Sequence, residues 1–204
     1  MSFHPKMSYD ATFHRSARTL APDDSGAPFV YTPENRARFD VFIQRYPADR
    51  KRSAVLPALY LVQHQQGFIT GSAMRYVAGL LEITPADVED VVSYYTMFYT
   101  KPVGTYVINV CRTLSCALNG AERVTEALSA KLGIAPGQTD ASGTFTLQEV
   151  ECLGACDRAP VIMVNDAWHE CLTPSAVPTL VDDLRARGEA ALSGCHHVIE
   201  RKPQ

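Results

Sequence analysis

The sequence predicts an α+β protein in which a bundle of helices precedes a smaller domain built from both strands and helices. Two observations lead to this prediction. Between residues 33 and 95 the apolar residues recur at intervals of three and four, as they do along one face of a helix. After residue 101, short β-branched runs alternate with helical patterns in the order β-α-β-β-α.

Four helices are expected in the first half of the chain, and two of them have clear N-terminal signals. Thr32-Pro33 and Thr84-Pro85 each combine a capping hydroxyl with a proline in the first helical turn. The apolar faces are expected to carry Phe39, Phe42, Ile43, Val55, Leu59, Val62, Met74, Val77, Leu80, Leu81, Val88, Val91 and Val92. We therefore predict a helical bundle over residues 31–100, after a flexible N-terminal arm over residues 1–30.

The second half is expected to form one small domain over residues 101–187, followed by a C-terminal tail over residues 188–204. Its strands are recognised by β-branched residues and by alternation with period two, and its helices by apolar spacing. The expected elements are strands over 106–110, 145–150 and 161–164, a hairpin partner over 168–171, and helices over 120–132 and from residue 173 onward. This order is an α+β or thioredoxin-like pattern.

Composition excludes several classes of function. The 204 residues include 46% hydrophobic residues, which is enough to bury a core. A net charge of −3 leaves no excess positive charge to neutralise a phosphate backbone, so no nucleic-acid partner is expected. Because no apolar run of about 18 residues occurs, we expect no membrane insertion. The N-terminus lacks the apolar core of a secretory signal, which indicates a reducing, intracellular compartment.

All six cysteines lie after residue 110, and the first four form two pairs. The pairs are Cys111-x4-Cys116 and Cys152-x3-Cys156, and each begins where a predicted strand ends. If the two strands are neighbours in the sheet, the four thiolates converge on one centre. Four soft sulfur donors favour zinc or an iron–sulfur cluster over hard cations.

The spacing within each pair favours a [2Fe–2S] cluster. Structural zinc usually binds C-x2-C knuckles, whereas pairs spaced by four and three residues suit one pair per iron. A structural zinc-binding module and a thiol–disulfide enzyme stay open as alternatives. Gly154 is expected to let amides point at sulfur, and Leu114, Leu118, Leu153 and Ala155 to form an apolar shell.

The sequence around these cysteines resembles a known family. Cys111-x4-Cys116, the segment VECLGAC over residues 150–156 and Ala159-Pro160 are similar to the [2Fe–2S] E-subunit family of bacterial NADH:quinone oxidoreductase, respiratory complex I. Upstream, the helix containing residues 58–63 and the aromatic run over residues 94–98 also fit that family. The resemblance covers about residues 33–178, which is most of the chain.

The resemblance implies a helical bundle followed by a thioredoxin-like [2Fe–2S] ferredoxin domain. It implies one [2Fe–2S] cluster ligated by Cys111, Cys116, Cys152 and Cys156, with no catalytic residue in this chain. The chain would transfer electrons within the enzyme, close to the flavin of a partner that binds FMN and NADH. Further peripheral-arm iron–sulfur subunits would be partners, and the complex would place the chain at the cytoplasmic face of the inner bacterial membrane. Equivalent subunits of NAD-linked hydrogenases and formate dehydrogenases share these motifs and form the alternative.

Three remaining features are given structural interpretations. Cys171 is expected in a strand as a small buried hydrophobe. Cys195-His196-His197 is expected at the surface of the tail, with no second half of a metal site. The aromatic cluster of Tyr94, Tyr95, Phe98 and Tyr99 is expected to pack between the bundle and the ferredoxin domain, in preference to a partner surface.

Overall fold

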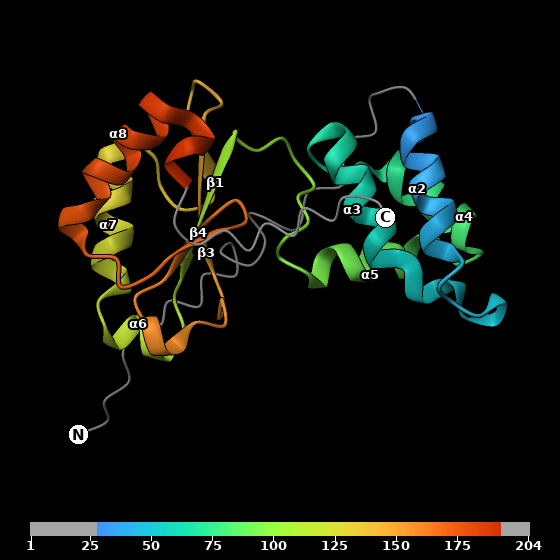
Figure 1. Ribbon diagram of the computed structural model, residues 1–204, viewed down its shortest axis with the longest axis horizontal. Coiled ribbons are helices and arrows are strands. Elements are labelled where there is room, and N and C mark those ends of the chain that lie inside the picture. Colours follow the sequence, from blue (N-terminus) through green and yellow to red (C-terminus); the bar gives the residue numbers. More distant parts are fainter. Residues whose placement is uncertain (1–27, 193–204) are drawn as a thin grey trace. The chain divides into compact units, whose positions relative to one another are not determined.

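The computed structural model describes residues 28–192 of the chain, and Cys195, His196 and His197 lie outside them. The chain divides into two compact units, with the boundary between Pro102 and Val103 (Figure 1). Each unit has a hydrophobic core of its own. Within the described residues, no helix combines the length and the apolar character that crossing a bilayer requires.

The first unit contains the four predicted helices. They are α2 (Pro33–Ile43), α3 (Val55–Gln66), α4 (Gly71–Leu81) and α5 (Pro85–Tyr94), with a 3-10 helix (Ala48–Ala54) before α3. Threonine hydroxyls cap three of them, because Thr32, Thr70 and Thr84 each accept a hydrogen bond from an amide in the first turn. Gly67 ends α3 in the left-handed conformation with φ of 86°.

The core of this unit includes residues from the segment that precedes α2. Phe29 and Tyr31 are buried, and both rings pack edge-on against Tyr76 at centroid distances of 5.5 and 5.1 Å. The Tyr31 hydroxyl also donates a hydrogen bond to the carbonyl oxygen of Ala58. Phe29, which was expected in the flexible arm, is therefore part of the folded unit. In the aromatic run at the end of this unit, Phe98 is buried in the same core, whereas Tyr94 is 75% exposed.

The second unit is built on a five-stranded mixed sheet of order β2-β3-β1-β4-β5. The strands are β1 (Tyr106–Cys111), β2 (Gln138–Thr139), β3 (Phe145–Val150), β4 (Ile162–Val164) and β5 (Ala167–His169). Among the strand pairs in the described residues, only β1 and β3 pair in parallel, and every residue of β1 is buried. The short strand β2 was not predicted, and β5 ends earlier than the expected 168–171 segment.

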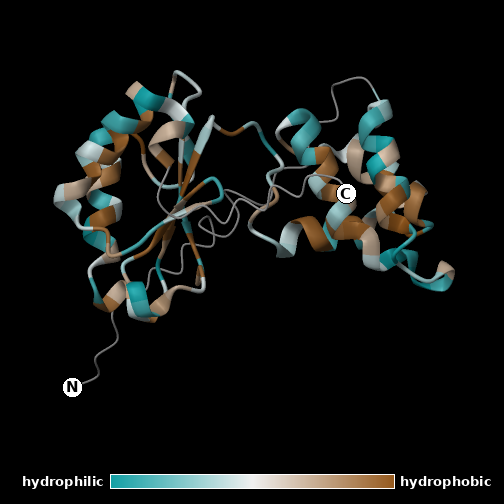
Figure 2. Ribbon diagram, in the orientation of Figure 1, coloured by the Kyte–Doolittle hydropathy of each residue, from teal (hydrophilic) through white to brown (hydrophobic). Residues whose placement is uncertain are grey.

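Two helices, α7 (Ala121–Leu132) and α8 (Val177–Arg187), lie side by side on the sheet (Figure 1). Figure 2 shows hydrophobic residues along the strands and mixed colouring on both helices, as expected when one helical face covers a sheet. A 3-10 helix (Gly188–Leu192) continues the domain past the expected boundary at residue 187, and its Leu192 is buried in the core.

Candidate metal centre

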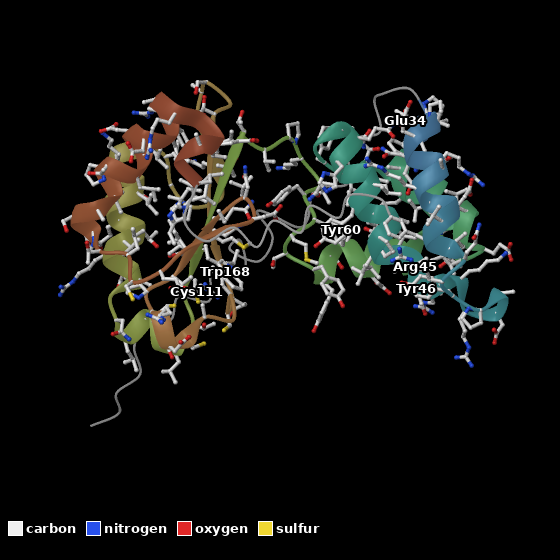
Figure 3. The ribbon with its side chains drawn as sticks, viewed as in Figure 1. Glu34, Arg45, Tyr46, Tyr60, Cys111 and Trp168 are labelled. Carbon is white, nitrogen blue, oxygen red and sulfur yellow. The ribbon has the colours of Figure 1, made fainter. Side chains whose placement is uncertain are left out.

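The two cysteine-bearing loops leave the sheet side by side. β1 ends at Cys111 and β3 ends at Val150, and these two residues are aligned across the parallel pair. The amide of Arg112 donates to the carbonyl oxygen of Val150, which continues the pairing by one residue beyond β1. The strands that precede the two cysteine pairs are therefore neighbours, the condition for a single centre. Figure 3 shows Cys111 at the end of the sheet nearest helix α6.

Cys116 lies on helix α6 (Leu114–Leu118), which follows directly after the first loop. Both Cys111 and Cys116 are buried, with 2% of each residue exposed. This helix was not predicted, because five residues are too few to show helical periodicity. The available signal was Thr113, a common helix-capping residue immediately before Leu114.

The second pair lies on a loop whose backbone turns toward sulfur. Gly154 adopts a left-handed φ of 84°, and its amide donates to Cys152 Sγ at 3.4 Å. This confirms the expectation that glycine lets an amide approach a cysteine here. Cys156 begins a 3-10 helix (Cys156–Arg158), and its Sγ lies 3.3 Å from that of Cys152. Both of these cysteines are exposed.

A small apolar cluster surrounds the first pair of cysteines. Cys111 and Cys116 pack with Ala121, Ala155 and Val161, and Leu153 and Ala159 lie against this group. Leu153 and Ala155 therefore contribute to the expected apolar shell. Leu114 and Leu118 do not, because they are 75% and 78% exposed on the outer side of the short helix α6.

Hydrogen bonds and burial together divide the four thiols into two with lowered pKa values and two with raised ones. Burial alone would raise the pKa of Cys111, but hydrogen bonds from Thr113 and from the Leu153 amide outweigh it and lower the pKa. The Gly154 amide and the neighbouring Cys156 lower the pKa of Cys152. Burial raises the pKa of Cys116 to about 11, and the adjacent Cys152 raises that of Cys156.

Cys171 does not occupy the expected buried strand position. It is exposed and lies beyond the end of β5, with a positive φ of 49°. Its amide donates to the carbonyl oxygen of Arg158, in the segment that precedes β4. The prediction of a buried residue was wrong because β5 stops at His169.

The donor set fits a binuclear iron–sulfur cluster. Four cysteine sulfurs in two pairs, presented by two adjacent loops, match the ligands of a [2Fe–2S] centre. In the part of the chain that the structure describes, no three Cys, His, Asp or Glu side chains are grouped as ligands of one metal ion. The five cysteines described there are all free of disulfides.

Residues 39–185 match the sequence profile of the family described as thioredoxin-like [2Fe-2S] ferredoxin. The chain belongs to this family. A member of this ferredoxin family contains a [2Fe–2S] cluster, which agrees with the cysteine donor set.

Relatives of this chain are subunits of NADH-quinone oxidoreductases. It is 42% identical over 165 residues to the E subunit of the NADH-quinone oxidoreductase of Mycobacterium bovis, in an alignment that covers 79% of this chain and 65% of that protein. The chain thus spans less than two thirds of that relative's length. It is also 42% identical over 162 residues to subunit 2 of the NADH-quinone oxidoreductase of Thermus thermophilus, covering 76% of this chain and 90% of that protein.

A solved structure has the same fold. The crystal structure of an NAD+-reducing [NiFe]-hydrogenase in the H2-reduced state aligns with a TM-score of 0.57 and 21% sequence identity. The alignment covers 66% of this chain and 23% of the hydrogenase chain. At this level of identity the likeness concerns the fold alone.

Proposed function

We propose that this chain is the electron-transfer subunit of an NADH:quinone oxidoreductase. It carries one [2Fe–2S] cluster ligated by Cys111, Cys116, Cys152 and Cys156, close to the flavin of a partner that binds FMN and NADH. The observation that supports this most strongly is the parallel pairing of β1 and β3, which presents both cysteine pairs at one end of the sheet. The 42% identity to subunits of such enzymes supports the choice of complex.

The chain's own residues would hold the cluster at the boundary between core and solvent. A [2Fe–2S] cluster supplies one-electron transfer when it is bound. Cys111 and Cys116 anchor the inner side, because they are buried among apolar side chains. Cys152 and Cys156 are exposed and face the outer side, through which an electron partner can approach. The amides of Leu153 and Gly154 donate to sulfur and thus favour the thiolate forms that bind iron.

We infer the partners and the location from the same proposed complex. The flavin- and NADH-binding subunit would contact this chain directly, and other peripheral-arm iron–sulfur subunits would belong to the same assembly. The assembly would sit on the cytoplasmic face of the inner membrane of a bacterium.

Metal analysis tests the cofactor. The full chain, purified without oxygen, should be reddish-brown and contain about two irons and two sulfides. On reduction it should give a rhombic EPR signal. A colourless protein with a single zinc ion would overturn the proposal and support the structural zinc-binding module instead.

Affinity purification from the native organism tests the complex. The expected result is recovery of a flavin subunit together with membrane subunits that reduce quinone. Recovery of a hydrogenase or formate dehydrogenase subunit in their place would show that the chain serves one of those enzymes.

A further inference from the structure

The hydroxyl of Thr113 contacts sulfur instead of capping the helix that it precedes. Thr113 occupies the N-cap position of α6, and its Oγ1 lies 3.2 Å from Cys111 Sγ. Among the described residues, no amide of α6 donates to this hydroxyl. By contrast, Thr32, Thr70 and Thr84 cap α2, α4 and α5 with their hydroxyls. The Thr113 hydroxyl thus contacts a cysteine sulfur and does not accept the amide hydrogen bond that an N-cap threonine usually accepts.

The side chain of Thr113 also affects the second cysteine loop. It lowers the pKa of Cys152, which follows β3, whereas its contact at 3.2 Å is with Cys111 at the end of β1. Thr113 is half-buried, which limits the access of water to these contacts.

We propose that Thr113 is a positioning residue that fixes the sulfur of Cys111 and raises the reduction potential of the cluster that this sulfur ligates. This inference rests on the proposed [2Fe–2S] site. A metal-bound thiolate has no proton, so in the loaded protein the hydroxyl must be the donor and the sulfur the acceptor.

The direction of the effect follows from charge. One-electron reduction adds an electron and no proton, which takes four thiolates and a [2Fe–2S] core from a net charge of −2 to −3. A hydrogen bond to a ligand sulfur becomes stronger as negative charge on that sulfur increases. The bond therefore stabilises the reduced form more than the oxidised form, and its loss lowers the potential.

The test compares Thr113→Val with Thr113→Ser in the full chain carrying its cluster. Valine keeps the branched shape and removes the hydroxyl, whereas serine keeps the hydroxyl. Thr139→Val is the matched control. Thr139 lies on β2, and its hydroxyl contacts Thr146 near the start of β3, whereas the cysteine loop follows the end of β3. The reduction potential is measured by redox titration monitored by EPR, with iron and sulfide counted for each variant.

Thr113→Val should lower the equilibrium constant for reduction about tenfold, which is about 59 mV for a one-electron couple. Thr113→Ser and Thr139→Val should match the wild-type potential. An unchanged potential in Thr113→Val with a full cluster would overturn the inference and leave the proposed function intact. A wild-type protein that binds zinc would instead overturn the proposed function.

If Thr113→Val does not assemble the cluster, its reduction potential cannot be measured, and the iron and sulfide content of the variants tests the inference. Thr113→Ala then carries the potential measurement with the same expected fall. If both variants lose the cluster and Thr113→Ser retains it, the hydroxyl is required to fix the Cys111 sulfur, as proposed. If Thr113→Ser loses it too, the hydroxyl is not the deciding group and the inference is wrong.

Discussion

The guanidinium of Arg112 lies 3.3 Å from the carboxylate of Glu151. This ion pair joins the residue after Cys111 to the residue before Cys152, so it bridges the two cysteine loops where β1 and β3 end. The backbone bond from Arg112 to Val150 lies beside it. The loops are thus connected by main chain and by side chain on the same residue.

Removal of this ion pair should have little effect on stability. The Arg112 and Glu151 side chains are 38% and 66% exposed, so solvent screens their attraction. Glu151→Gln should change the free energy of unfolding by less than about 1 kcal/mol, measured by urea denaturation with circular dichroism. Asp183→Asn, which removes the exposed Arg187–Asp183 pair, is the control and should behave alike. A loss above about 2 kcal/mol in Glu151→Gln alone would show that the pair holds the loops together.

Replacement of each of the four site cysteines should affect the cluster, whereas replacement of the fifth described cysteine should not. Serine at Cys111, Cys116, Cys152 or Cys156 should reduce the iron and sulfide content or alter the EPR signal of the reduced protein. Cys171→Ser should leave the iron and sulfide content and the EPR signal unchanged. Cys171 lies beyond β5, and its backbone amide forms a hydrogen bond with the carbonyl oxygen of Arg158. If Cys171→Ser loses iron while Cys152→Ser does not, the proposed ligand set is wrong.

Gly154 should resist replacement because of its backbone conformation. Its φ is 84°, and a Cβ at this position would meet no atom within 4 Å, so crowding is not the obstacle. Gly154→Ala should cost about 1–2 kcal/mol of unfolding free energy, since an L-residue is disfavoured in the left-handed region. Gly79→Ala is the matched control on helix α4, where a Cβ also meets nothing. It should stabilise the protein by about 0.5–1 kcal/mol. Equal effects of the two changes would contradict this explanation.

The capping box of α5 should make the helical unit sensitive to acid. Hydrogen bonds from the Thr84 hydroxyl and amide lower the pKa of Asp87 below its ordinary value. Because the folded pKa is the lower one, this contribution to stability is complete above the unfolded pKa of about 3.9. It is lost as pH falls through the folded pKa.

Thr84→Val should raise the pKa of Asp87 toward its ordinary value, as followed by NMR titration of the carboxyl carbon. Thr70→Val removes the capping hydroxyl of α4 instead and should leave the pKa of Asp87 unchanged. A pKa of Asp87 that does not move in Thr84→Val would show that the hydroxyl is not its cause and would leave the Thr84 amide and the ion pair with Arg52 as the causes.

The local elements could be predicted from sequence because their signals are local. Thr84-Pro85 marks the start of α5, and the β-branched run before Cys111 marks β1. Both features reflect backbone preferences that act within a few residues. The position of each cysteine pair after a strand was predictable for the same reason. Helix α6 and the early end of β5 were missed, because elements of three to five residues carry too little periodicity.

By itself the sequence determined that two cysteine pairs follow two strands, and their spacing favoured an iron–sulfur centre. Only the tertiary structure decided that β1 and β3 are parallel neighbours, so that both pairs reach the same end of the sheet. It also decided that the Thr113 hydroxyl contacts Cys111 instead of capping α6, and that Cys171 is exposed. Strand pairing and side-chain partners join residues far apart in the chain, and local preferences do not specify them.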